Sequence, residues 1–161
     1  MLEEENVVPD FKLPEDNGKE FHLRANKSKM IVLFFYPKAD TTGCTKEAIA
    51  FSDLITEFET AGVKVIGISP DSIDKLLKFK KKHDLKVLLL SDIEKEVSMR
   101  YAVWVEKSMY GKKYMGVERT TYLINANMKL LKVWRKVKVS GHAEAVYKTA
   151  LKLLGEDCLS H

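Results

Sequence analysis

The chain has 161 residues, of which 45% are hydrophobic and 31% are charged. This length fits one domain, and this composition is typical of a globular protein rather than a disordered one. The 27 basic and 23 acidic residues give a formal net charge of +4, and the two kinds are interleaved along the chain. Because a nucleic-acid groove needs a denser basic stripe, we expect no nucleic-acid partner.

The sequence predicts a cytoplasmic location and no membrane span. Residues 1–6 are acidic and lack an apolar core, so we expect no targeting peptide. The longest apolar runs, Met30–Phe35 and Val87–Leu90, are too short to cross a bilayer. The two cysteines, Cys44 and Cys158, do not make a disulfide framework, which favours a reducing compartment.

Seven segments have the composition of strands. Two are short early strands, three are continuous apolar runs typical of buried central strands, and two flank a turn at residues 125–127 and predict a hairpin. In chain order they are Val7–Leu13, Glu20–Leu23, Met30–Tyr36, Val63–Ile68, Lys86–Leu90, Thr120–Ile124 and Leu130–Arg135.

Four segments between the strands show helical spacing of apolar residues. The first helix is expected from residue 42 to a stop at Gly62, and the second starts at Asp71-Ser72. A capping box of Ser91 and Glu94 opens the third, which leads toward Tyr101. The fourth runs from Ser140 to a stop at Gly155. Strands that alternate with helices and end in a hairpin and a helix predict an α/β sandwich with a mixed central sheet. We expect one domain, residues 1–155, and a mobile tail, residues 156–161.

The strongest chemical signal lies where the third expected strand ends. Pro37 starts a loop there, Thr41 is a natural N-cap, and Cys44 falls in the first turn of the following helix. Unpaired N–H groups and the positive end of the helix dipole favour a thiolate at that position. Most free cysteines are small buried hydrophobes, and this alternative stays open. The position of Cys44 after a strand and a proline loop favours a reactive thiol instead.

The pattern Pro37-x-x-x-Thr41-x-x-Cys44 resembles the active-site signature of the peroxiredoxins. The longer string 36–45 resembles the bacterioferritin comigratory protein, or peroxiredoxin Q, subgroup. The resemblance continues at residues 68–72, 109–112, 119–124 and 137–143, so it covers nearly the whole chain. It implies a thioredoxin-like fold with N-terminal strand additions. It also implies a thiol-specific peroxidase that reduces hydrogen peroxide and organic hydroperoxides.

The resemblance also implies roles for individual residues. Cys44 matches the peroxidatic nucleophile, which peroxide oxidises to sulfenic acid. Arg119 matches the arginine that this family brings beside the sulfur, while Pro37 and Thr41 match its shield and its hydroxyl ligand. Glu47 is a candidate support for the arginine, or an exposed first-turn glutamate that stabilises the helix dipole. No metal, flavin or haem is implied, because the sulfur is the redox centre.

One position departs from the subgroup pattern. Many members carry a resolving cysteine five residues after the first, and this chain has Ile49 there. Cys158 is the only other thiol, and we interpret it as an incidental surface cysteine in preference to a resolving one. We therefore expect a one-cysteine cycle in a monomer or weak dimer, with thioredoxin, glutaredoxin or a small thiol as the reductant.

Two other functions remain open. Disulfide exchange on proteins is disfavoured, because the chain has no Cys-x-x-Cys motif and carries Thr41 where that motif would place a second cysteine. A non-enzymatic holdase on the same fold is the second alternative. A metal site is disfavoured, because Cys158 and His161 offer only two ligands.

Overall fold

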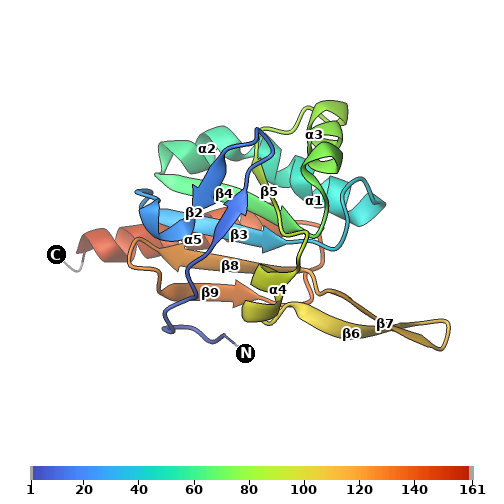
Figure 1. The fold of residues 1–161 in the computed structure, drawn as a ribbon. Helices are drawn as coiled ribbons and strands as arrows, with labels where there is room; N and C mark the ends of the chain where they lie inside the picture. Colours follow the sequence, from blue (N-terminus) through green and yellow to red (C-terminus); the bar gives the residue numbers. More distant parts are fainter. Residues whose placement is uncertain (1, 160–161) are drawn as a thin grey trace.

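A five-stranded mixed sheet forms the centre of the protein (Figure 1). This computed structural model describes the backbone of residues 2–159 and the side chains of residues 2–155. The strand order is β5-β4-β3-β8-β9; the first three strands run parallel, and β8 and β9 are antiparallel to their neighbours. Their limits are β3 Met30–Phe35, β4 Val63–Ser69, β5 Leu88–Ser91, β8 Thr120–Asn125 and β9 Leu130–Trp134.

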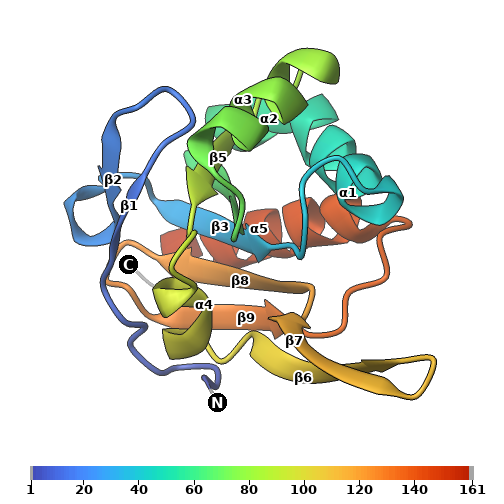
Figure 2. The same ribbon diagram turned by 45° about the vertical axis from the view of Figure 1, so that its right-hand side comes forward.

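Within residues 2–159, five α-helices and a short 3-10 helix surround the sheet (Figures 1 and 2). They are η1 Leu23–Ala25, α1 Thr42–Asp53, α2 Ile55–Thr60, α3 Ile73–Lys82, α4 Glu96–Arg100 and α5 His142–Leu159. None of the helices within residues 2–159 is long and apolar enough to cross a membrane.

The central strand β3 is buried on both faces, as its continuous apolar sequence predicts. Its alternate side chains point to opposite faces. Met30, Val32 and Phe34 pack in one hydrophobic cluster with residues of α1, α2, α3 and α5. The intervening side chains pack in a second cluster with residues of α4 and of two short strands, β1 Lys12–Pro14 and β2 Glu20–His22.

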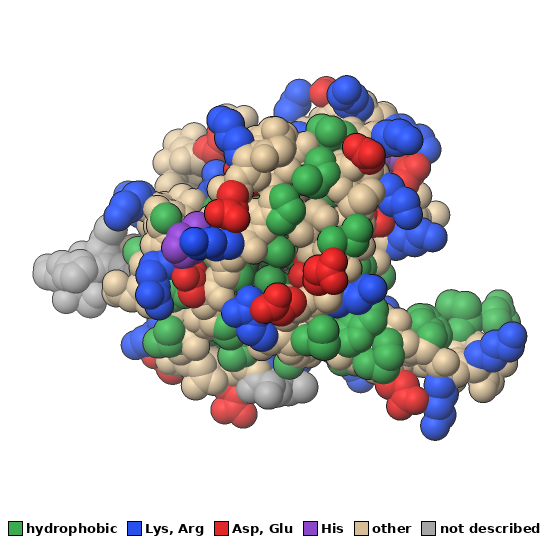
Figure 3. Space-filling view, viewed as in Figure 1, with side chains coloured by type: hydrophobic (Ala, Val, Ile, Leu, Met, Phe, Trp, Pro, Cys, Tyr) green, Lys and Arg blue, Asp and Glu red, His purple; other side chains and the backbone are tan. Residues whose placement is uncertain are grey.

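A second two-stranded sheet projects from the body as a hairpin (Figure 2). It consists of β6 Trp104–Met109 and β7 Lys112–Val117. Tyr110 and Gly111 form its turn with φ angles of 50° and 78°, the left-handed pair that suits a two-residue hairpin loop. Figure 3 shows hydrophobic side chains on the hairpin; the exposed ones are Met109, Tyr110, Tyr114 and Met115. The sequence did not predict this hairpin.

The α/β sandwich, the central strands and the closing hairpin are confirmed, with strand ends shifted by at most two residues. The expected strand Val7–Leu13 is wrong for most of its length. Val7 makes only an isolated bridge to Lys129, and β1 starts at Lys12. The expected first helix, residues 42–62, is two helices, because the backbone at Leu54 leaves the helical region with φ −99° and ψ 6°.

The expected capping box at Ser91 is also wrong. Ser91 is the last residue of β5, and its hydroxyl donates to the backbone oxygen of Asp71. Helix α4 begins later, at Glu96, and the carboxylate of Asp92 accepts hydrogen bonds from the backbone N–H groups of Val97 and Ser98. A buried carboxylate thus performs the capping expected of a serine.

The last helix, α5, begins at His142, two residues after the expected start at Ser140. It continues through Gly155 to Leu159, so Gly155 does not end it. Residues 160–161 lie outside the described residues, as do the side chains from residue 156 onward. The mobility of the tail, residues 156–161, stays a prediction.

Candidate active site

Cys44 lies in the first turn of α1, as the sequence predicts. Strand β3 ends at Phe35, the loop from residue 36 to residue 41 crosses its end, and α1 begins at Thr42 with Thr41 as N-cap. The Cys44 side chain is 1% exposed. The thiol therefore sits at the positive end of a three-turn helix, shielded from bulk water.

Hydrogen bonds to distant segments hold the loop before α1. The backbone N–H of Ala39 donates to the buried carboxylate of Asp71, just after β4, over 2.7 Å. Asp40, with φ 62°, places its carboxylate 2.8 Å from Lys82 Nζ and 2.8 Å from His83 Nε2 at the end of α3. These hydrogen bonds keep the pKa of Asp40 below its ordinary value, with His83 the larger cause.

Thr41 and Pro37 belong to this loop. The Thr41 hydroxyl donates to the backbone oxygen of Lys38 over 2.8 Å and makes no hydrogen bond to the helix N–H groups. Thr41 is thus the N-cap by backbone conformation only. Pro37 is half-buried. The expected roles of both residues toward a peroxide stay predictions.

Arg119 reaches the sulfur from the segment just before β8, the strand that pairs with β3. Its Nη2 lies 3.3 Å from Cys44 Sγ. Strand pairing explains this contact: Phe35, at the end of β3, pairs with Thr120, at the start of β8, so the residue before Thr120 lies beside the loop that leads to α1. Gly43 makes room for the guanidinium, because a Cβ at that position would lie 3.1 Å from Nη2.

Glu47 completes a buried chain of polar groups. Its Oε1 accepts a hydrogen bond from Arg119 Nη1 over 2.7 Å, and its side chain is 1% exposed. The alternative of an exposed glutamate acting on the helix dipole is therefore wrong. Burial raises the pKa of Glu47 to about 7, although Arg119 opposes the shift. For Arg119, burial alone would lower the pKa, but Glu47 and Cys44 raise it above its ordinary value.

Two further side chains, His142 and Lys107, lie near enough to Arg119 for its charge to affect their pKa values. His142, at the start of α5, is buried; its Nε2 lies 2.8 Å from Thr121 Oγ1, and its ring packs edge-on against Phe51. Burial, with the charge of Arg119, lowers the pKa of His142 to about 4, so the imidazole is neutral at pH 7. The sequence pattern does not indicate this buried hydrogen bond.

Lys107 of β6 is the other neighbour, and sequence reasoning missed it. The pKa of Lys107 lies below its ordinary value, because burial and the charge of Arg119 lower it more than Cys44 and Glu118 raise it. Lys107 belongs to the hairpin that the sequence did not predict. If β6 had been predicted as a strand, Lys107 could have been placed near the site.

The positions relevant to a resolving step are Ile49 and Cys158. Ile49 is partly buried and packs against the core cluster that contains Cys44. Cys158 has its side chain outside the described residues, so its role stays a prediction. Among the residues whose side chains are described, no group of three or more His, Cys, Asp or Glu could hold a metal ion.

Residues 5–133 match the sequence profile of the AhpC/TSA family. The chain belongs to the AhpC/TSA family. Peroxiredoxin Bcp of Bacillus subtilis is 46% identical over 142 residues, which cover 88% of this chain and 90% of the relative. Peroxiredoxin Bcp of Escherichia coli K12 is 39% identical over 141 residues, which cover 88% of this chain and 90% of that protein.

Solved structures of peroxiredoxins agree with the fold. The bacterioferritin comigratory protein of Xanthomonas campestris, described for its alkyl peroxide reduction activity, superimposes with a TM-score of 0.86 at 35% identity. The match covers 92% of this chain and 98% of that one. Peroxiredoxin Q of Xylella fastidiosa gives a TM-score of 0.89 at 30% identity, with 95% and 97% covered. The expected family and the thioredoxin-like fold are confirmed.

This peroxiredoxin is therefore a thiol-dependent peroxidase, an oxidoreductase that acts on a peroxide and draws electrons from a thiol. Family membership favours this activity over disulfide exchange on proteins and over a holdase function.

Proposed function

We propose that Cys44 is the sulfur that attacks the peroxide. The observation that carries this proposal is the 3.3 Å contact between Arg119 Nη2 and Sγ of Cys44, a buried cysteine in the first turn of α1. The thiolate donates an electron pair to one peroxide oxygen, and the O–O bond breaks. The second oxygen leaves as hydroxide or alkoxide and takes up a proton to give water or an alcohol. The sulfur is oxidised by two electrons to sulfenic acid.

Arg119 stabilises both ends of this reaction. A guanidinium beside the sulfur favours the thiolate, and it also stabilises the negative charge that develops on the departing oxygen. The hydroxyl of Thr41 donates to Lys38, so its oxygen lone pairs are free to accept the proton of a bound peroxide. Pro37 limits the access of water to the loop.

Glu47 acts through Arg119 as a positioning residue. Its 2.7 Å ion pair fixes one guanidinium nitrogen, so that the other points at the sulfur. A Glu47→Gln variant keeps an oxygen for Arg119 and is expected to retain most of the single-turnover rate. A Glu47→Leu variant leaves the guanidinium without its partner and is expected to react more slowly.

The cycle that fits this chain uses one cysteine. A thiol of a redoxin such as thioredoxin or glutaredoxin, or a small thiol, attacks the sulfenic acid, releases water and forms a mixed disulfide with Cys44. A second thiol then attacks this disulfide and releases the reduced Cys44. Support comes from Ile49, which packs in the core where many subgroup members have a resolving cysteine. The proposed state is a monomer or weak dimer in the cytoplasm, which size-exclusion chromatography and cell fractionation test.

The assignment is tested with a matched pair of serine variants. Cys44→Ser is expected to lose peroxide consumption with dithiothreitol as reductant while it keeps the circular dichroism spectrum of the wild type. Cys158→Ser, which removes the other thiol, is expected to keep the activity. Turnover that survives in Cys44→Ser would end the assignment of Cys44.

A further inference from the structure

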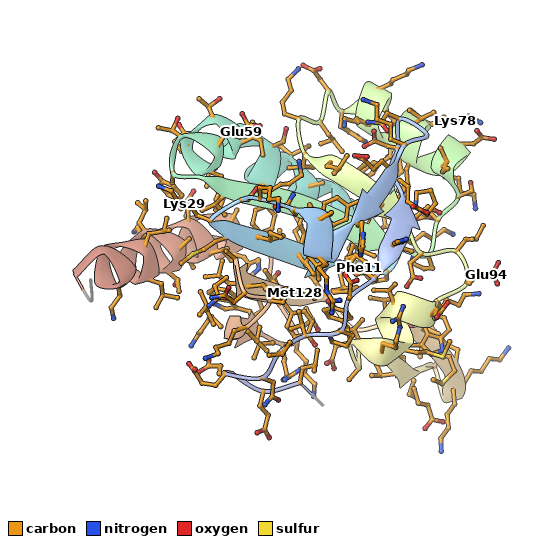
Figure 4. All side chains as sticks on the ribbon, turned by 60° about the vertical axis from the view of Figure 1, so that its left-hand side comes forward. Phe11, Lys29, Glu59, Lys78, Glu94 and Met128 are labelled. Carbon is orange, nitrogen blue, oxygen red and sulfur yellow. The ribbon has the colours of Figure 1, made fainter. Side chains whose placement is uncertain are left out.

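A cavity of about 460 Å³ lies at the amino-terminal ends of the parallel strands β3, β4 and β5. Its lining comes from the loop before β3, from α2, from the start of β4, from α3 and from the segment that leads into β5. Cys44 follows the opposite end of β3. Figure 4 shows Lys29 and Glu59 at the cavity end of the sheet. The volume falls within the range of about 300–1,000 Å³ that small-molecule sites occupy.

The charged side chains that line this cavity are mostly basic. They are one glutamate, Glu59, and five lysines: Lys27, Lys29, Lys64, Lys80 and Lys86. Lysines that line one concave site create a positive potential there, which a bound anion would neutralise.

Two of the five lysines have carboxylate partners. Lys80 Nζ lies 3.0 Å from Asp16 Oδ2, and the Asp16 side chain, only 4% exposed, also accepts a hydrogen bond from the backbone N–H of Leu89. This anchored carboxylate fixes Lys80 at the cavity wall. Lys86 pairs with Asp84 where both are more than half exposed, a setting in which an ion pair contributes little.

The other three lysines of the lining are Lys27, Lys29 and Lys64. Within the part of the chain whose side chains are described, they form no salt bridge. The stem of Lys29 crosses Gly62, where a Cβ would lie 2.9 Å from Lys29 Cδ. The absence of a side chain at Gly62 thus leaves room for the stem of Lys29, which belongs to the cavity lining.

Apolar residues complete the lining. Ile55 of α2 and Leu88 of β5 are partly buried and face the same space. A cavity that combines an apolar wall with several ammonium groups suits an organic molecule that carries a cluster of negative charges. Lysine binds phosphate as a point charge, without the planar geometry that arginine requires.

We propose that this cavity binds a small molecule with adjacent phosphate groups, of the nucleoside polyphosphate class. The phosphates contact Lys29, Lys64 and Lys80, and the organic part packs on Ile55 and Leu88. The site is separate from Cys44, so its occupation does not depend on the assignment of the peroxidatic residue.

The test uses ATP, tripolyphosphate and adenosine as probes, by isothermal titration calorimetry at one fixed ionic strength. ATP and tripolyphosphate are expected to bind saturably with one molecule per chain, and adenosine is expected not to bind. The cavity variant Lys29→Ala/Lys64→Ala is expected to weaken ATP binding by about tenfold or more. The control variant Lys112→Ala/Lys113→Ala removes the same charge from the distant hairpin and is expected to leave the affinity unchanged.

Equal losses in the two double variants would show that ATP responds only to net charge, and would overturn the proposal. The same conclusion follows if no saturable binding is found, or if adenosine binds as tightly as ATP. Circular dichroism and the peroxidase rate of the cavity variant verify that the fold and the Cys44 site are intact.

Discussion

Arg119 bridges Glu47 and Cys44, with one terminal nitrogen 2.7 Å from the carboxylate and the other 3.3 Å from the sulfur. The carboxylate is buried, and its second oxygen, Oε2, has no hydrogen-bond partner among the residues whose side chains are described. Arg119 thus stabilises the ionised form of Glu47, which burial disfavours, and a second N–H group of the same guanidinium faces the sulfur. The electrostatics of the thiol and those of the core are coupled through one side chain.

The first prediction concerns Arg119. Replacement by Met keeps most of the side-chain volume and removes the charge beside Cys44. Loss of one charge-assisted contact, worth about 1.5–3 kcal/mol, is expected to slow the single-turnover reaction with peroxide about tenfold or more. Stopped-flow measurements after mixing reduced protein with peroxide give this rate. Arg24→Met removes an exposed arginine and serves as the control; an equal rate in both variants would contradict the role of Arg119.

The second prediction is a pH dependence of stability due to Glu47. The ordinary pKa of 4.5 is raised to about 7 in the folded chain. Between these values the unfolded chain releases a proton that the folded chain keeps, so stability declines as the pH rises from about 4.5 to about 7. The decline amounts to about 3–4 kcal/mol at most, from about 1.4 kcal/mol per pKa unit.

Urea denaturation of wild type and Glu47→Gln at pH 5 and pH 8 measures this effect. The variant is expected to gain stability relative to wild type as the pH rises, because a glutamine does not ionise. Glu57→Gln, on the exposed side of α2, is the control and is expected to follow the wild type. A Glu47→Gln curve parallel to the wild type would mean that the carboxyl titrates normally.

The third prediction concerns His142, whose titration changes the stability with pH in the direction opposite to that of Glu47. Its pKa falls from 6.5 to about 4 on folding, so the unfolded chain binds a proton before the folded chain does. Stability due to the neutral imidazole is complete above about pH 6.5 and is lost as the pH falls toward 4. His142→Gln is therefore expected to be less stable than wild type at pH 8, with a gap that narrows at pH 5. Thermal unfolding at the two pH values decides, and a constant gap would refute this assignment.

The fourth prediction concerns over-oxidation. In a regular helix, Cα atoms five residues apart lie about 8–9 Å from each other, and a disulfide needs less than about 7 Å. Because position 49 is an isoleucine, unwinding of the first turn of α1 cannot be followed by a disulfide between positions 44 and 49. Excess peroxide without a reductant is expected to convert Cys44 to sulfinic acid in both wild type and Cys158→Ser. Intact mass and peptide mapping identify the product. A rapid, nearly complete disulfide between Cys44 and Cys158 in the wild type would contradict the one-cysteine cycle.

The features that could be predicted from the sequence are local ones. Six consecutive apolar residues, Met30–Phe35, determine a strand buried on both faces, and the loop after Pro37 fixes where α1 starts. The hairpin β6–β7 escaped prediction because most of its side chains are exposed or half-exposed, so no alternation of buried and exposed residues marks it.

The burial of Glu47 could not be predicted for a different reason. A glutamate near the start of a helix is an ordinary surface residue unless a cation covers it, and here the cation lies 72 positions later in the chain. Only the antiparallel pairing of β3 with β8 brings Arg119 to Glu47. Similarly, the capping role of Asp92 depends on its burial, which the sequence pattern at Ser91 does not show.

The long separation between Cys44 and Arg119 has a consequence during synthesis of the chain. Helix α1 leaves the ribosome well before β8, which pairs with β3 in the folded sheet. Until β8 pairs with β3, Cys44 lacks the guanidinium that lies 3.3 Å from its sulfur in the folded chain. The contact between this sulfur and its guanidinium is therefore a mark of completed folding, because it forms only when two segments 75 positions apart have come together.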